Sequence, residues 1–211
     1  MIVFFSASNS FSYSAGSPSG YTGSPGDNLS TCVSCHGVNT HESLLPYSLS
    51  IISDIDQYYV PGHLYNFTIN VLGGGAEKFG FQTCFENEEG QKVGEIILTD
   101  SVQTQLISSG NYITHTSNGV NGLSSKSWSF YWKAPIANQG QITVYTSALL
   151  SGNSILGVDD YALSSSQSFD PSELGCLDSE AINFNEEATI DDATCFYESY
   201  SSTSSLSLSY D

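Results

Sequence analysis

The sequence predicts an all-β fold, most simply an antiparallel β-sandwich. Helix formers are scarce in the 211 residues, whereas Ser, Thr, Gly, Tyr, Phe, Val and Ile are plentiful, and this balance favours strands and turns. Short alternating or apolar runs follow one another along residues 47–169, and turn sequences such as "VPGH", "NEEG" and "SNGVNG" separate them. Seven or eight short strands at this spacing are typical of a sandwich of two sheets.

The pattern places the expected strands at 47–52, 64–72, 77–86, 92–99, 111–116, 125–134, 140–150 and 159–169. In "SKSWSFYWKA" the alternation puts Trp128, Phe130 and Trp132 on one face, which we expect to be the core face. The aromatic residues of "EKFGFQTCFE" alternate in the same way. Cys84 in that run points to the opposite side, and we expect a buried free thiol that packs as a small hydrophobe.

Both ends of the chain differ in character from this central part. Residues 1–15 are interpreted as the remnant of a secretory signal or as a first strand, "IVFF". A Gly-, Ser- and Pro-rich coil follows and begins the main domain, 16–170. A compact acidic segment, 171–197, and a Ser-rich tail, 198–211, complete the expected organisation. An exported protein would suit both disulfides and covalent haem attachment.

The charge of the chain excludes several classes of function. Four lysines are the only basic residues apart from histidine, arginine is absent, and the formal net charge is −18. Binding to a nucleic-acid backbone or to an anionic membrane surface depends on Lys and Arg, so neither is expected. The sequence contains no run of 18 apolar residues, so it predicts no membrane-spanning helix. Cationic partners and divalent cations remain compatible with this charge.

The sequence "CVSCH" at residues 32–36 is the motif with the clearest chemistry. Covalent haem attachment needs two thiols for the vinyl groups and a histidine for the iron, and Cys32, Cys35 and His36 supply all three on one short turn. Three alternatives stay open: a redox dithiol, which should open a helix after a strand, a zinc site, which needs a fourth ligand, and a plain disulfide.

A bound haem would need a group for its second axial position. Met1 is the only methionine, which argues against His/Met ligation and leaves His41, His63, His115, a lysine or an open site. His115 is the favoured ligand, because it ends a strand-like run before a Gly-rich loop and can project over a cofactor. Ligation by two histidines would close both axial positions and favour electron transfer.

Several blocks of the sequence resemble a known family. "SPSGYTGSPGDNLSTCVSCH", "YVPGHLYNFTINV", "KFGFQTCF", "NYITHTSNG", "SWSFYWKAP" and "GQITVYTSALLSGN" occur in the order found in the reeler-like domains of Bacteroidetes surface proteins, which are called choice-of-anchor V domains. The resemblance covers about residues 16–169. It implies an immunoglobulin-like sandwich, an exported location and a C-x-x-C-H motif near the mature N-terminus. The family's histidine-threonine pair maps to His115, whereas His63 departs from the family pattern.

The acidic segment "GCLDSEAINFNEEATIDDATC" resembles short Cys-bracketed modules of secreted marine bacterial proteins, with Phe184 in place of the usual tyrosine. A bridge between Cys176 and Cys195 would close a loop of about 20 residues and contribute roughly 3 kcal/mol. The segment also offers oxygen ligands of the kind calcium prefers, although their spacing is not that of an EF-hand loop. These residues are Asp178, Asn183, Asn185, Asp191 and Asp192. A disulfide-stapled spacer is the other interpretation.

No enzyme motif is found in the sequence. Gly-x-Ser-x-Gly elbows, Gly-rich phosphate loops and His-Glu-x-x-His are absent, and the pair Asp159-Asp160 is interpreted as a solvated turn. We therefore expect an exported monohaem c-type cytochrome that transfers electrons at the cell surface to a redox partner protein or an extracellular acceptor. Polymerisation of the chain would extend such transfer. The alternative is a structural or adhesive surface module whose cysteines form a disulfide or hold zinc.

Overall fold

The computed structural model describes residues 13–36, 47–152 and 160–198. The chain divides into two compact units, residues 1–171 and residues 172–211. The division lies next to the change of composition that the sequence shows near residue 170. The two units are described separately below.

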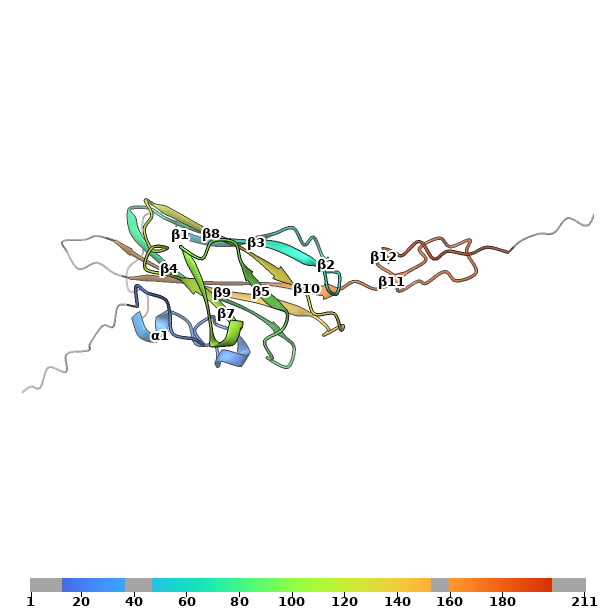
Figure 1. The fold of residues 1–211 in the computed structure, drawn as a ribbon, viewed down its shortest axis with the longest axis horizontal. Coiled ribbons are helices and arrows are strands. Elements are labelled where there is room, and N and C mark those ends of the chain that lie inside the picture. Colours follow the sequence, from blue (N-terminus) through green and yellow to red (C-terminus); the bar gives the residue numbers. More distant parts are fainter. Residues whose placement is uncertain (1–12, 37–46, 153–159, 199–211) are drawn as a thin grey trace, which may run out of the picture. The chain divides into compact units, whose positions relative to one another are not determined.

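Two sheets form the first unit, and Figure 1 shows them as layers. The first sheet contains four strands in the order β1 (Tyr47–Ser53), β3 (Leu64–Gly73), β8 (Ser125–Lys133) and β5 (Glu95–Leu98). The second contains six strands in the order β2 (Tyr58–Tyr59), β10 (Tyr161–Pro171), β9 (Ile142–Gly152), β4 (Ala76–Asn87), β7 (Tyr112–His115) and β6 (Thr104–Ile107). β2 runs parallel to β10, and the other described pairs of these sheets are antiparallel. The predicted all-β sandwich is confirmed.

Aromatic side chains from both sheets fill the core. Along β8 the burial alternates, so that Trp128, Phe130 and Trp132 are buried as the sequence pattern predicts. Phe81 of β4 stacks on Trp128 with ring centroids 4.3 Å apart, and Phe85 stacks on Trp132 at 4.6 Å. Burial of rings of this size supplies most of the favourable energy of such a core.

The outer face of the six-stranded sheet is covered as well, because residues 13–36 lie over it. Figure 1 shows this blue segment on the side of the sheet opposite to β1, β3 and β8. It contains two short helical elements, the 3-10 turn η1 (Pro25–Asp27) and the helix α1 (Val33–His36). β4 is consequently buried on both faces from Phe81 to Asn87, and Cys84 is a fully buried free thiol, as predicted. A further 3-10 turn, η2 (Ser108–Gly110), precedes β7.

The described residues of the second unit, 172–198, contain little regular structure. Its two short strands, β11 (Leu174–Gly175) and β12 (Ile190–Asp191), pair in parallel, and the predicted disulfide joins Cys176 to Cys195. Among the described residues of the whole chain, no helix has the length and apolar character that crossing a membrane requires.

Candidate cofactor site

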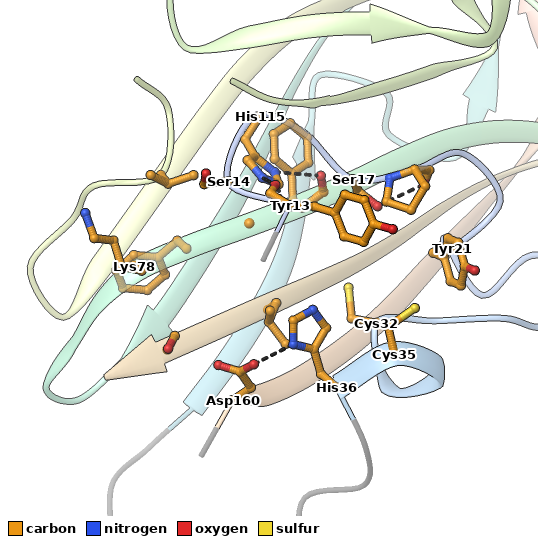
Figure 2. Close-up of a pocket in the computed structure, with 17 residues that line it drawn as sticks. Tyr13, Ser14, Ser17, Tyr21, Cys32, Cys35, His36, Lys78, His115 and Asp160 are labelled. Atoms are coloured by element: carbon orange, nitrogen blue, oxygen red, sulfur yellow. Dashed lines mark hydrogen bonds and ion pairs between the residues drawn. The ribbon is translucent and has the colours of Figure 1, made fainter. Parts of the chain in front are cut away.

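A cavity of about 430 Å³ lies between the N-terminal coil and the outer face of the six-stranded sheet. Figure 2 shows the side chains that line it. One side is formed by the coil and by the C-x-x-C-H motif, the other by β4, β7 and β9. The lining residues are Tyr13, Ser14, Ser17, Pro18, Tyr21, Cys32, Cys35, His36, Lys78, Phe79, Gly80, Phe81, His115, Val120, Leu149, Ser151 and Asp160. The cavity thus joins the motif to His115, which the sequence places far away.

The motif forms a single helical turn at one wall of the cavity. The N–H of His36 donates to the carbonyl oxygen of Cys32 at 3.0 Å, which brings both residues to the same side of α1. The N–H of Cys32 donates to the hydroxyl of Ser147 on β9 at 3.1 Å, and this bond attaches the turn to the sheet. The cysteines of a redox dithiol lie at the start of a helix that follows a strand. Here the helix has four residues and follows a Ser- and Thr-rich coil, so the structure differs from that arrangement.

The two motif thiols are free and are not bonded to each other. Burial raises the pKa of the Cys32 thiol, so this sulfur is a neutral thiol at neutral pH. A hydrogen bond with Cys35 raises the pKa of Tyr21, whose ring lines the same cavity. The attacking cysteine of a redox dithiol has a lowered thiol pKa, and Cys32 has the opposite shift.

His36 is held by an acidic partner. Its Nδ1 lies 2.5 Å from Oδ2 of Asp160, which is the residue before β10 (Figure 2). Since Asp160 occupies Nδ1, the Nε2 atom of the imidazole is the one available to a ligand. The interpretation of Asp160 as a residue of a solvated turn is therefore wrong, because its carboxylate contacts His36 and lines the cavity. Asp159 lies outside the described residues.

His115 is buried at the end of β7, on the opposite side of the cavity from α1 (Figure 2). Its Nδ1 lies 3.1 Å from the N–H nitrogen of Phe81 and 3.3 Å from the carbonyl oxygen of the same residue. Its Nε2 lies 3.1 Å from the carbonyl oxygen of Tyr13. Burial lowers the pKa of His115, which keeps the imidazole neutral, and neutral imidazole is the form that binds metals.

Gly80 on β4 makes room for the His115 ring. A Cβ atom built at Gly80 would lie 2.9 Å from Cε1 of His115, closer than side chains tolerate. The ring therefore packs directly against the backbone of β4. Nothing in the sequence around "KFGFQ" indicates this contact, because the two residues lie on different strands.

The other histidines considered as axial ligands are placed differently. His63 is exposed in the connection between β2 and β3, where its ring lies 4.8 Å from that of Tyr65, and it does not line the cavity. His41 lies outside the described residues. Lys78 lines the cavity, and its ammonium group contacts the side-chain oxygen of Asn121. His115 and Lys78 are thus the nitrogen donors that face the motif within the described part of the chain.

A buried charged cluster lies beside the cavity. Lys92 contacts the carboxylates of Glu86, on β4, and Asp27, in η1, with its side chain 13% exposed. The oxygens that Lys92 contacts accept a second bond each: the hydroxyl of Ser24 donates to Oε1 of Glu86 at 2.5 Å, and that of Tyr112 donates to Oδ1 of Asp27 at 2.6 Å. The other two oxygens are also satisfied, because Oε2 of Glu86 accepts the N–H of Gly26 at 3.1 Å and Oδ2 of Asp27 accepts the hydroxyl of Thr22 at 2.6 Å. These bonds fasten the coil that precedes the motif to the sheet.

Among the described residues, one group of side chains brings ligand atoms close enough together to hold a metal ion. This group consists of Asp27, Cys84 and Glu86. Lys92 already neutralises that group. The ligand atoms of Cys32, Cys35 and His36 do not gather in this way, so the described residues provide no ready tetrahedral zinc site at the motif.

The residues predicted to bind calcium make local hydrogen bonds in the second unit. The carboxylates of Asp178, Asp191 and Asp192 accept backbone N–H groups two residues further along the chain, at 2.9 to 3.0 Å. The side chain of Asn185 accepts the N–H of Glu187 in the same manner, whereas that of Asn183 accepts the N–H of Phe196, 13 residues further along. The calcium site stays a prediction.

Comparison with known proteins gives little further information. No protein-family model matches this sequence, and no curated protein sequence matches it either. Among solved structures the chain is similar to AggA, the major subunit of aggregative adherence fimbriae type I from Escherichia coli, with 10% sequence identity and a TM-score of 0.41. The similarity covers 63% of this chain and 99% of AggA.

Proposed function

We propose that this protein is an exported monohaem c-type cytochrome that transfers electrons at the cell surface. Cys32 and Cys35 would hold the haem through thioether bonds, and His36 and His115 would bind the iron from its two sides. The observation that supports this best is that one cavity is lined by all four side chains, two thiols and two imidazoles, although β7 and α1 lie far apart in the sequence.

The chemistry of these donors fits haem. The thiols are free for addition to vinyl groups, and Nε2 of His36 is left available by Asp160. Phe79, Phe81, Val120 and Leu149 give the cavity an apolar wall of the kind that porphyrin rings contact. When bound, haem iron supplies one-electron chemistry.

His115 would have to exchange its hydrogen bonds to bind iron. Nδ1 accepts the N–H of Phe81 at 3.1 Å and Nε2 faces the carbonyl oxygen of Tyr13 at 3.1 Å, so the proton of the neutral ring lies on Nε2. Binding through Nε2 would move this proton to Nδ1, where the carbonyl oxygen of Phe81, at 3.3 Å, is the acceptor within reach. Nε2 must first leave the carbonyl oxygen of Tyr13. We therefore infer that the coil at Tyr13 moves when the site is filled.

The edge of the cavity reaches the surface, where a partner can approach. Tyr13 is 45% exposed, and Cys35 and Lys78 are exposed. We propose a redox partner protein or an extracellular acceptor, and a net charge of −18 favours a partner surface that carries positive charge. Membership of the reeler-like family, the exported location and polymerisation of the chain remain parts of this proposal.

Attachment of haem tests the proposal directly. The full chain is produced in a host with haem-attachment machinery, and its mass, colour and pyridine haemochrome spectrum are measured beside those of the Cys32→Ser/Cys35→Ser variant. We expect one covalent haem in the wild-type protein and none in the variant. A colourless wild-type protein that holds zinc or a Cys32–Cys35 disulfide would support the structural or adhesive alternative instead.

A further inference from the structure

Asp160 lies in contact with His36, and the proposed binding of iron by His36 does not by itself explain this contact. Nδ1 of His36 and Oδ2 of Asp160 are 2.5 Å apart, and their side chains are 16% and 30% exposed. The two residues are 124 positions apart in the sequence. A hydrogen bond between a carboxylate and an imidazole is charge-assisted, and such bonds are stronger than those between neutral groups.

The elements that carry the pair are fixed to each other by a third residue. The hydroxyl of Ser147, fully buried on β9, accepts the N–H of Cys32 at 3.1 Å and donates to the carbonyl oxygen of Leu163 at 3.2 Å. Leu163 belongs to β10, the strand that Asp160 precedes. Ser147 thus ties the start of the motif to the strand that presents the carboxylate.

The chemical consequence of the pair follows from its atoms. A carboxylate that accepts Nδ1–H fixes the tautomer and the orientation of the ring and makes Nε2 more basic. A more basic axial nitrogen stabilises oxidised iron over reduced iron, because it donates more charge to the metal.

We propose that Asp160 is the positioning residue of His36: it presents Nε2 to the iron and holds the reduction potential of the site low. This inference rests on the proposed function, since it concerns the same histidine and the same haem. It adds that Asp160, the residue before β10, determines the redox behaviour of the motif on α1.

The first experiment measures the midpoint potential of the haem-loaded full chain by spectroelectrochemistry. Asp160→Asn removes the charge and keeps an acceptor oxygen, whereas Asp160→Ala removes both. We expect Asp160→Ala to shift the oxidation equilibrium toward the reduced form by at least about tenfold, which is 59 mV for a one-electron couple, and Asp160→Asn to shift it less. The control is Glu77→Gln, which removes an equal charge from an exposed position on β4 beside the cavity-lining Lys78.

The second experiment uses the full chain produced without haem-attachment machinery, so that it does not depend on haem. Long-range ¹H–¹⁵N correlation spectra report the tautomer of neutral His36. We expect Nδ1–H in the wild-type protein and a mixture of tautomers in Asp160→Ala. Circular dichroism establishes whether both variants are folded. If Asp160→Ala is not folded, the potential of Asp160→Asn from the first experiment tests the inference.

The outcomes separate the two proposals. If the wild-type protein takes up no haem, but the tautomer of His36 changes between the wild type and Asp160→Ala, the proposed function is contradicted and the Asp160–His36 pairing is left intact. The inference is overturned if Asp160→Ala keeps the wild-type tautomer. It is equally overturned if the Asp160 variants keep the wild-type potential, or if Glu77→Gln moves the potential as far as they do.

Discussion

His115 is positioned by the residues on which its ring packs. The ring lies against the backbone at Gly80, and its two nitrogens contact main-chain atoms of Phe81 and Tyr13. The contacts with Gly80 and Phe81 orient the imidazole before any cofactor is present, which lowers the cost of ordering it when a ligand binds. The contact of Nε2 with the carbonyl oxygen of Tyr13 must be broken before this nitrogen can bind iron.

Replacing Gly80 with Ala should displace this ring. The added methyl group would lie 2.9 Å from Cε1 of His115, and overpacking of this kind costs about 1–3 kcal/mol. We expect lower stability in urea unfolding of the haem-free protein and a weakened low-spin spectrum in the haem-loaded protein. In a His115→Ala background the same substitution should cost much less, because the clash is gone. Equal costs in both backgrounds would contradict the assigned contact.

At the scale of elements, the coil that carries the motif is held by buried charges. Residues 22–27 contact the outer face of β4 through Asp27, Glu86 and Lys92, and Cys84 lies between them with its pKa raised by burial to about 11. A coil rich in Gly and Ser has little apolar surface of its own, so these polar contacts provide most of its attachment.

Substituting Lys92 with Met should release this coil. The substitution leaves two buried carboxylates without their counter-charge, a change that typically costs about 3–5 kcal/mol. Equilibrium unfolding in urea measures the loss, and Lys133→Met, on an exposed position of β8, should stay within about 0.5 kcal/mol of the wild type. A Lys92→Met protein as stable as the Lys133→Met protein would show that the cluster does not hold the coil.

The same cluster predicts how stability depends on pH. Burial raises the pKa of Asp27, but hydrogen bonds from Thr22, Tyr112 and Lys92 outweigh this and lower the pKa below its usual value. A lowered folded-state pKa gives stability that is complete above the unfolded pKa, about 3.9, and is lost as the pH falls through the folded value. Between pH 5 and pH 2, Asp27→Asn should therefore lose less stability than the wild type. Parallel stability curves would exclude this role for Asp27.

The strands and the site differ in how far the sequence predicts them. The alternation of apolar and polar residues predicts β8 and its core residues, because a strand with one buried face has this pattern within its own sequence. It does not predict β2 and β6, which are short, and of the second buried face of β4 it predicts Cys84 alone. Gly80 and Asp160 were missed as site residues since their partners, His115 and His36, lie on other elements.

At the scale of the whole molecule, the number of free thiols shows whether haem is attached to Cys32 and Cys35. Of five cysteines, Cys176 and Cys195 form the disulfide, and Cys84 is fully buried. After unfolding without reductant, we expect three titratable thiols in the haem-free protein and one in the haem-loaded protein. In the folded haem-free protein Cys84 should react slowly, because burial raises its pKa to about 11. Three thiols in a coloured protein would show that the haem is not attached through Cys32 and Cys35.

The central claim is that one haem lies between His36 and His115. The most direct test is the optical and electron paramagnetic resonance spectrum of the oxidised, haem-loaded protein, recorded for the wild type, His115→Ala and His63→Ala. We expect low-spin iron in the wild type and in His63→Ala, whose ring packs on Tyr65 away from the cavity. His115→Ala should become high-spin or water-bound, with a raised potential, and its reduced form should bind carbon monoxide. A low-spin spectrum that survives in His115→Ala and is lost in His63→Ala would contradict the account.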